Sequence, residues 1–375
     1  MKVTFFINYL NHHQLPVADE MYKILGDDFH FVATYPRNPE ELKGGFDYSD
    51  RPYCLLAAEL KEDCQKAHQL NIESDVCVFG AGNLDWECER ATTDKLSFEI
   101  SERWFKRGLI NILSPRLIKW WWLYQTKLRK KPFYKLCASA FTASDCNKLL
   151  TFRNRCFKWG YFTHLPEYSP RLNKTADNII RIMWCGRLIP LKHADHLIEA
   201  SHKLINTGYR FAVDIYGDGP CKQALQHLID SKDLSDIISL RGNISNKDVL
   251  DEMRKSEIFV FTSDRKEGWG AVVNEAMSSG CCIVGSDATG SVPFLIKDRY
   301  NGMIYRDGHV DSLYNKVKYL LDNPDICRSM GEKAASDLRN IWSPGRAANN
   351  LLKLISEIQS NVCSSILEGP CSVAK

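Results

Sequence analysis

Short apolar runs alternate with longer segments of helical periodicity along the whole chain, and this alternation constrains the fold more than any other feature. The predicted strands cover residues 3–8, 29–33, 75–79 and 134–141 in the first half, and 179–185, 211–216, 237–240, 258–262 and 282–285 in the second. Apolar runs of this length between helical segments are typical of βαβ units, which build parallel sheets. The sequence therefore predicts an α/β protein.

Helical segments and polar stretches set the predicted domain boundaries. Helices are predicted at 194–206, 220–230, 247–255 (capped by Asn246) and 271–279, with three more up to about residue 360. The polar, proline-bearing stretch from Pro166 to Asn178 is interpreted as a linker. We expect two Rossmann-like domains, at 1–170 and 171–345, and a final helix and tail at 346–375. The last fifteen residues are expected to fray, and the sequence leaves open whether the final helix packs back on the N-terminal domain.

The composition excludes several classes of protein. Of 375 residues, 44% are hydrophobic and 25% charged, which is typical of a folded globular protein rather than a disordered one. The net charge of +3 does not indicate a nucleic-acid partner. The fourteen cysteines never show C-x-x-C spacing, which favours reduced thiols in a cytoplasmic protein over a zinc or redox motif. No apolar stretch reaches the ~18 residues of a membrane-spanning helix, and residues 1–8 are interpreted as a strand, not a signal peptide.

The strongest functional signal is the segment EGWGAVVNEAMSSG, which begins at Glu267. Glu267 follows the predicted strand at 258–262, and Glu275 lies just over a turn into the next helix, so both carboxylates can face one ligand. Gly268 and Gly270 allow backbone N–H groups to approach that ligand, and the N–H groups at the helix start suit a phosphate oxygen. A carboxylate such as Glu275 is suited to accept hydrogen bonds from a ribose diol. The alternative is two solvated glutamates beside a glycine turn.

Three weaker signals follow other predicted strands of the same domain. Arg187 and Lys192 stand in the segment GRLIPLK, where two cations just before a helix can neutralise a diphosphate. The turn YGDGP, with Gly217 and Asp218, and the segment RGN, with Gly242, follow the next two strands. Each segment alone is equally typical of an ordinary surface loop or tight turn. Ligands of such sheets bind beyond the carboxyl ends of the strands, however, and all four segments lie there.

Together these segments resemble the family 4 retaining glycosyltransferases of the GT-B fold, over roughly residues 179–310. The family hallmark E-x7-E is matched by Glu267 and Glu275, its GRL-x-x-x-K segment by Arg187 and Lys192, and its YGDGP turn by the same letters. The resemblance implies two Rossmann-like domains facing each other across a cleft, with the acceptor on the N-terminal and the nucleotide-sugar donor on the C-terminal domain. It implies that Arg187 and Lys192 hold the donor diphosphate, that Glu275 holds the ribose, and that Glu267 lies near the transferred sugar.

The resemblance also implies a reaction. We expect a retaining hexosyltransferase that uses a UDP- or GDP-linked sugar and a glycan or lipid-linked acceptor, in cell-surface polysaccharide or lipopolysaccharide synthesis. The chain has no Asp-x-Asp, so Arg187, Lys192 and helix N-termini, rather than a metal ion, are expected to balance the diphosphate charge. No further cofactor is expected. No covalent nucleophile is evident, so we expect front-face transfer in which the leaving phosphate helps to deprotonate the acceptor.

The chain departs from the family pattern in several places. Trp269 stands where many members have phenylalanine, and residues 289–294 (TGSVPF) lack the acidic residue of the usual G-G-x-x-E segment, which leaves sugar specificity open. The loop after the first strand, NYLNHHQ, has no glycine. In it, His12 or His13 can contact a phosphate or the acceptor, or be an ordinary loop histidine. Residues 101–103 (SER) are a second polar cluster that can face the cleft.

A basic, aromatic segment covers residues 103–131, with RWFKR at its start and RLIKWWWLYQTKLRKK at its end. Tryptophans interleaved with lysine and arginine are typical of elements at a membrane interface. We therefore predict peripheral attachment to an anionic membrane on its cytoplasmic side. The alternative is a helix whose tryptophans pack into the core while its cations are solvated. The fold context argues against nucleic acid.

Other functions stay open at this point. A sugar phosphorylase or nucleotide-sugar epimerase would share the fold, and a non-catalytic sugar- or membrane-binding relative would bind a donor without turnover. A dinucleotide-dependent oxidoreductase is disfavoured, because GAGNLD at 80–85 lacks the third glycine and no complete G-x-G-x-x-G follows any predicted strand.

Overall fold

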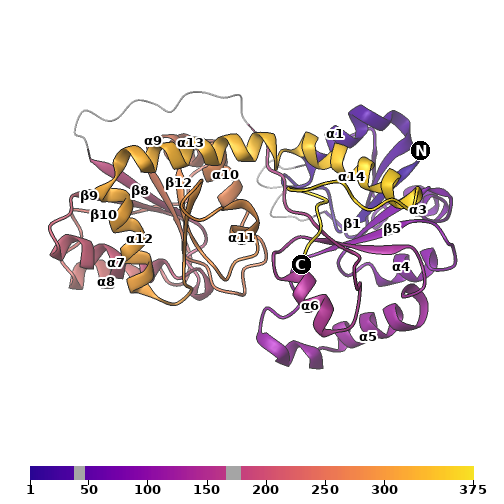
Figure 1. Cartoon of the computed structure of the whole chain (residues 1–375), viewed down its shortest axis with the longest axis horizontal. Coiled ribbons are helices and arrows are strands. Elements are labelled where there is room, and N and C mark those ends of the chain that lie inside the picture. Colours follow the sequence, from indigo (N-terminus) through magenta and orange to yellow (C-terminus); the bar gives the residue numbers. More distant parts are fainter. Residues whose placement is uncertain (38–46, 166–178) are drawn as a thin grey trace. The chain divides into compact units, whose positions relative to one another are not determined.

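The computed structural model describes residues 1–37, 47–165 and 179–375, which gather into two compact units (Figure 1). Unit 1 comprises Met1–His164 and Ile341–Lys375, and unit 2 comprises Leu165–Asn340. The final helix and tail therefore belong to unit 1. The predicted linker at 166–178 lies outside the described residues.

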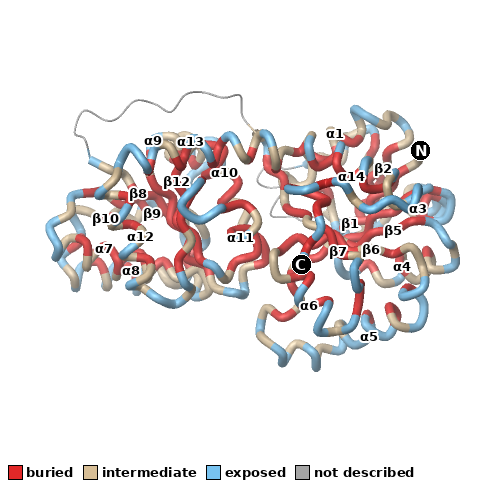
Figure 2. Tube along the Cα trace, in the orientation of Figure 1, coloured by how far each residue is buried: buried red, intermediate tan, exposed pale blue. Residues whose placement is uncertain are grey.

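Unit 1 is built on a seven-stranded parallel sheet in the order β3-β2-β1-β4-β5-β6-β7. Its strands are β1 (Val3–Ile7), β2 (Phe29–Ala33), β3 (Cys54–Leu55), β4 (Val76–Gly80), β5 (Ser97–Ser101), β6 (Phe133–Cys137) and β7 (Cys156–Lys158). Its helices are α1 (Leu15–Leu25), α3 (Lys61–Glu73), α4 (Leu84–Arg90), α5 (Pro115–Leu123), α6 (Thr142–Lys148) and α14 (Pro344–Gln359), with 3-10 turns η1 (Gly26–Asp28) and η2 (Gly108–Leu113) and the π-turn η3 (Tyr124–Leu128). Every residue of β1 and β4 is buried, as expected of parallel strands covered on both faces (Figure 2).

Three strands of unit 1 escaped the sequence prediction, and one predicted strand was too long. The run predicted at 134–141 ends as a strand at Cys137 and then turns into α6. β5 was missed because its apolar pattern is interrupted by Glu99, which is buried and paired with Lys135 on β6 at 2.9 Å. β3 and β7 are two and three residues long, too short to produce a periodic pattern.

The expectation of a frayed C-terminus is wrong. Cys371 is fully buried, and Val373 forms an antiparallel bridge with Phe157 of β7. The N–H of Lys158 donates to the carbonyl of Ser372 at 2.7 Å. The tail thus covers the edge strand of the sheet, whose outer backbone groups need partners. Helix α14 packs beside α1 from the other end of the chain (Figure 1).

Unit 2 contains a six-stranded parallel sheet in the order β10-β9-β8-β11-β12-β13. Its strands are β8 (Ile180–Cys185), β9 (Phe211–Tyr216), β10 (Ile238–Gly242), β11 (Ile258–Phe261), β12 (Cys282–Ser286) and β13 (Gly302–Tyr305). Its helices are α7 (Ala194–Asn206), α8 (Lys222–Ser231), α9 (Asn246–Lys255), α10 (Val272–Ser278), α11 (Val292–Leu295), α12 (Val310–Asp322) and α13 (Pro324–Asn340), with a 3-10 turn η4 (Pro190–Lys192). Helices α7, α8 and α12 cover one face of the sheet, and α9, α10 and α13 cover the other (Figure 1).

The second half of the chain was predicted more closely than the first. β8 to β12 are confirmed to within two residues, and α7 matches at both ends, whereas β13 was missed. The prediction that Asn246 caps this helix is wrong. Ser245 is the cap, because its Oγ accepts the N–H of Asp248 at 3.2 Å, and Asn246 is the first helical residue.

Both sheets have the strand order of a doubly wound fold. In each sheet the chain first adds strands on one side of the first strand and then on the other side. The reversal lies between β1 and β4 in unit 1 and between β8 and β11 in unit 2. Ligands of such sheets bind beyond the carboxyl ends of the strands at this point. Ligand-binding residues are therefore expected in the loops that follow these four strands.

Candidate functional site

Glycine allows two loops of unit 2 to touch at the sheet edge. Gly217, after β9, has a φ of 133°, and a Cβ there would collide with the carbonyl oxygen of Gly186, after β8. The N–H of Leu188 donates to the carbonyl of Asp218 at 2.9 Å, and the N–H of Gly217 donates to that of Gly242 at 2.8 Å. Gly217 and Gly242, which were predicted to contact the ligand, thus help to join the loops that follow β8, β9 and β10. The exposed Asp218 carboxylate caps its own turn by accepting the N–H of Gly219 at 2.7 Å.

Lys192 and Glu267 form an ion pair across the reversal point of the sheet. Lys192 ends η4 after β8, Glu267 lies in the loop after β11, and the two side chains are only 15% and 17% exposed. The hydroxyl of Thr262 donates to the carbonyl of Lys192 at 2.6 Å and accepts from the indole N–H of Trp184 at 2.8 Å. The backbone carrying Lys192 is therefore held to the end of β11 by Thr262, whose hydroxyl accepts a hydrogen bond from the buried Trp184.

Glu275 lies in the first turn of α10 and has no ion pair or side-chain hydrogen bond among the described residues. Burial raises the pKa of its carboxyl group to about 7. The pKa of the neighbouring Cys185 thiol rises to about 12, because of burial and then the charge of Glu275, while Lys192 lowers it. Glu275 and Lys192 thus both lie near the carboxyl end of β8. A partly desolvated carboxylate without a protein partner is suited to a ligand hydroxyl.

The glycines between the two glutamates have structural tasks that their sequence pattern did not reveal. Gly270 has a φ of 88°, and a Cβ there would collide with the ring of Phe261. Gly268 is buried. The intervening Trp269 is 1% exposed, and its indole N–H donates to the side-chain oxygen of Asn274 at 2.9 Å. This loop is therefore a packed, shaped turn.

Arg187 lies exposed on the loop after β8 and makes no ion pair with any described residue. The structure thus brings Lys192, Glu267 and Glu275 together and places Arg187 on the loop that leads to Lys192. Two cations and two carboxylates at one sheet edge can bind a ligand that carries both phosphate and hydroxyl groups.

Unit 1 has a pocket of about 400 Å³ at the corresponding edge of its own sheet. His13 and residues 101–103 line it, as do Asn8, Asn11, Gln14, Lys106 and Tyr161. The hydroxyl of Tyr161 donates to Glu102 at 2.6 Å, and Glu102 also pairs with Lys106. Ser101 is 4% exposed, and its Oγ has no hydrogen-bond partner within the described part of the chain. The pocket is therefore polar, with hydrogen-bonding capacity left over.

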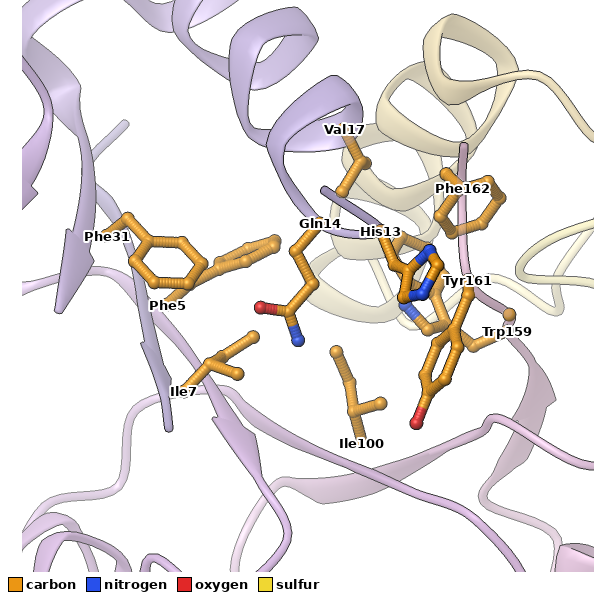
Figure 3. A pocket seen from close by; sticks show the side chains of 11 residues that line it. Phe5, Ile7, His13, Gln14, Val17, Phe31, Ile100, Trp159, Tyr161 and Phe162 are labelled. Atoms are coloured by element: carbon orange, nitrogen blue, oxygen red, sulfur yellow. The ribbon is translucent and has the colours of Figure 1, made fainter. Parts of the chain in front are cut away.

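A small apolar cavity adjoins this pocket (Figure 3). The amide of Gln14 projects between Ile7 and Ile100, and the ring of His13 stacks on Tyr161 with centroids 5.8 Å apart (Figure 3). Burial, and then the neighbouring His12, lower the pKa of His13 to about 3. His13 is therefore neutral at physiological pH, which suits a hydroxyl partner better than a phosphate.

The basic, aromatic segment presents an apolar surface. Trp120 is buried, as the core alternative supposed, but Trp121 and Trp122 of α5 are 39% and 60% exposed. In the preceding η2, Leu109, Ile110, Ile112 and Leu113 are between 43% and 73% exposed. In the described part of the chain, no helix has the length and apolarity needed to cross a bilayer.

Unit 2 is similar to a known protein family. Residues 168–337 match the model of the glycosyl transferases group 1. The C-terminal half of this chain is therefore similar to group 1 glycosyltransferase domains. It is similar to the alpha-D-kanosaminyltransferase of Streptomyces kanamyceticus, with 29% identity over 177 residues, covering 47% of this chain and 45% of the relative. It is also similar to the poly(ribitol-phosphate) alpha-N-acetylglucosaminyltransferase of Staphylococcus aureus, with 25% identity over 171 residues, 46% of this chain and 34% of that one. This chain thus spans less than half the length of these relatives.

Solved glycosyltransferase structures resemble the whole chain. A glycosyltransferase from Rickettsia africae aligns with a TM-score of 0.70 at 16% identity, covering 96% of this chain and 99% of that one. HepE of Anabaena, solved with UDP, aligns with a TM-score of 0.68 at 15% identity, covering 96% and 100%. At these identities the likeness concerns the fold, and it confirms the predicted GT-B class.

Proposed function

We propose that this protein transfers a hexose from a UDP- or GDP-linked sugar to a glycan or lipid-linked acceptor, with retention at the anomeric carbon. The observation that carries the proposal is the gathering of Lys192, Glu267 and Glu275 at the reversal point of the unit 2 sheet, within the group 1 domain. The kanosaminyl- and N-acetylglucosaminyltransferase relatives support sugar transfer as the activity. Polysaccharide or lipopolysaccharide assembly is the setting that we propose.

Each side chain has a role in the proposed reaction. Lys192 leaves Glu267 for the donor diphosphate, and Arg187 adds a second cation from the exposed loop. Together they stabilise the negative charge that develops on the leaving diphosphate, without a metal ion at that point. Glu267, released from Lys192, faces the transferred sugar, and Glu275 accepts hydrogen bonds from the ribose. The leaving phosphate takes the proton of the attacking hydroxyl, which bonds to the same face of the anomeric carbon.

Nucleotide binding tests the donor site directly. Thermal unfolding of the full chain is measured with UDP, GDP, ADP and NAD. A ligand at a hundred times its dissociation constant adds about 2.7 kcal/mol of stability, which raises the midpoint by several degrees. We expect UDP or GDP to produce this rise, Lys192→Met to abolish it, and Lys203→Met, an exposed control on α7, to retain it. A rise with NAD alone would refute the donor assignment.

Turnover then separates the proposed enzyme from its alternatives. The proton coupling of the anomeric centre in the product reports retention, and addition of a chelator reports whether transfer needs a metal. We expect transfer with retention and no loss on chelation. A glycosyl adduct trapped on Glu267 would disprove front-face transfer. Donor binding without turnover would identify a non-catalytic relative, and a requirement for inorganic phosphate a phosphorylase.

The polar pocket of unit 1 is the proposed acceptor site. The Ser101 hydroxyl has no hydrogen-bond partner among the described residues, and Glu102 is held by Tyr161, so both can bind the hydroxyl groups of a sugar acceptor. Tyr161→Phe removes the bond that orients Glu102. We expect it to raise the acceptor KM several-fold while the donor KM stays unchanged. Equal changes in both constants would contradict this assignment.

We further propose that unit 1 attaches to the cytoplasmic face of an anionic membrane through residues 103–131. This segment has nine Lys and Arg residues and no Asp or Glu, and it exposes the apolar side chains of η2 and α5. Apolar side chains that enter the headgroup region, flanked by cations, are typical of interfacial binding. Each cation near an anionic surface contributes about 1 kcal/mol. A lipid-linked acceptor would lie in the same membrane.

Flotation with vesicles that contain phosphatidylglycerol tests this attachment. We expect Ile110→Ser with Leu113→Ser to weaken binding at least about tenfold, since burial of each side chain is worth about 1.5–3 kcal/mol. Leu367→Ser removes an even more exposed leucine elsewhere on unit 1 and should bind as the natural protein does. Loss of binding in both variants, or in neither, would contradict the proposed surface.

A further inference from the structure

The start of α7 brings two imidazoles and a carboxylate together. One ligand atom from each of His193, Asp195 and His196 lies within 4.8 Å of the others. Nδ1 of His193 is 3.9 Å from one carboxylate oxygen of Asp195, and Nε2 of His196 is 4.0 Å from the other. These separations are too long for hydrogen bonds. They are slightly wider than the roughly 3.4 Å between donor atoms that share a tetrahedral metal ion at about 2.0–2.1 Å.

The backbone at His193 is in an unfavourable conformation. Its φ and ψ are both 47°, the left-handed region that glycine adopts readily and other residues uncommonly. This conformation turns the imidazole of His193 to the same side as that of His196, so that the rings stack at 4.6 Å with an angle of 11°. A strained residue that places a potential ligand is a reason to look for a bound group.

The atoms around the two rings suit a cation. Nδ1 of His196 is buried and has no hydrogen-bond partner within the described residues. Nε2 of His193 lies 3.6 Å from the Asp264 carboxylate, just beyond hydrogen-bond distance, and the N–H of Lys266 donates to that carboxylate at 2.7 Å. A carboxylate behind a histidine is the usual partner of a metal-bound imidazole, because it sets the orientation of the ring.

The neighbouring charges also favour a cation. The carboxylates of Asp264 and Asp307 both lie near the two imidazole rings. The segment HADH at 193–196 is the sequence signal for this cluster, which was not predicted.

We propose that His193, Asp195 and His196 bind a divalent transition-metal ion of the zinc class, with Asp264 orienting His193. Two imidazoles and one carboxylate are a ligand set that zinc and cobalt accept, with a fourth position open to water. Asp264 lies in the loop after β11 that leads to Glu267, and its N–H donates to the carbonyl of Leu191 at 2.9 Å. The ion therefore fastens the start of α7 to the loop that carries Glu267. This role is separate from the proposed transfer reaction, which uses no metal at the diphosphate.

Direct metal binding tests the proposal without any donor sugar. The full chain is freed of metal with a chelator and titrated with Zn²⁺ by calorimetry and with Co²⁺ by visible absorption. We expect one ion per chain and a Co²⁺ spectrum of tetrahedral intensity. Asp264→Asn should weaken binding roughly 10–100-fold. His196→Ala should abolish it, whereas His202→Ala, which alters a partly exposed histidine on the same helix, should leave it unchanged. Equal Zn²⁺ affinity in His196→Ala and the natural protein would overturn the proposal.

His193→Gly provides a second test that does not depend on a destabilised variant. Glycine relieves the left-handed strain, so with chelator this variant should unfold at or slightly above the midpoint of the natural protein. Zn²⁺ should raise the midpoint of thermal unfolding of the natural protein by several degrees and should not raise that of His193→Gly. An equal gain in both proteins would disprove the site. Because neither test uses a nucleotide sugar, failure here leaves the glycosyltransferase assignment intact, and failure of transfer leaves the metal site intact.

Discussion

Replacement of Glu275 by glutamine tests whether the buried, unpaired carboxylate of this residue lowers the stability of the fold. Burial raises the pKa of Glu275 from 4.5 to about 7. Because the folded pKa lies above the unfolded one, the favourable contribution of this group is complete below pH 4.5 and is lost as pH rises through 7. A difference of about 2.5 pH units at 1.36 kcal/mol each amounts to about 3.4 kcal/mol in full. About 0.8 kcal/mol of this is already lost at pH 5, so roughly 2.5 kcal/mol separates pH 5 from pH 8.

Glutamine has nearly the same shape and no charge, so it avoids this loss. We expect Glu275→Gln to be more stable relative to the natural protein at pH 8 than at pH 5, by about 2.5 kcal/mol. Urea unfolding of both proteins at both pH values measures this double difference, in which the constant effect of the amide cancels. Glu332→Gln, an exposed glutamate of α13 in the same unit, serves as the control and should give a difference near zero. A double difference near zero for Glu275→Gln would refute the reasoning, because the carboxylate would then be stabilised by a group that the structure does not show.

The same variant connects stability with the proposed donor site. An ionised carboxylate accepts stronger hydrogen bonds than an amide, by about 1 kcal/mol per bond. UDP should therefore bind the natural protein more weakly as pH falls from 8 to 6. Glu275→Gln should bind it about 5–10-fold more weakly at pH 8 and show little dependence on pH. Calorimetry at three pH values distinguishes these profiles.

Three further predictions concern the frame that carries the sites. Gly270→Ala introduces a methyl group that collides with an aromatic ring of β11. It should lower the free energy of unfolding by about 1–3 kcal/mol more than Gly280→Ala does, because Gly280 has a similar positive φ but open space around its Cβ. Urea unfolding of the two variants measures this difference. Lys135→Met leaves the buried Glu99 carboxylate unpaired and should destabilise unit 1 by about 3–5 kcal/mol at pH 7. Adding Glu99→Gln to this variant should restore much of the lost stability. If it restores none, the ion-pair explanation is contradicted. Removal of residues 366–375 uncovers the edge of β7 and should lower the thermal midpoint of the chain, whereas an unchanged midpoint would mean that the tail adds no stability.

Local patterns in the sequence predicted the elements whose neighbours along the chain determine them. β2, β9 and α7 were predicted at both ends, because an uninterrupted apolar run or a helical apolar stripe is visible within ten to fifteen residues. The motif around Glu267 and Glu275 also predicted that both residues lie beyond the carboxyl end of a strand, because the carboxyl ends of parallel strands lie together at one sheet edge. The resemblance built on it was confirmed for the family and the fold.

Only the tertiary structure decided what depends on contacts distant in the chain. β5 was missed because Glu99 is tolerated in a strand by Lys135, 36 residues later, and the tail is ordered because it pairs with β7. The pairing of Lys192 with Glu267, the desolvation of Glu275, and the approach of Asp264 to His193 likewise arise where loops of separate strands meet. Charge pairing and desolvation depend on the whole surroundings of a group, whereas periodicity depends only on the residues beside it.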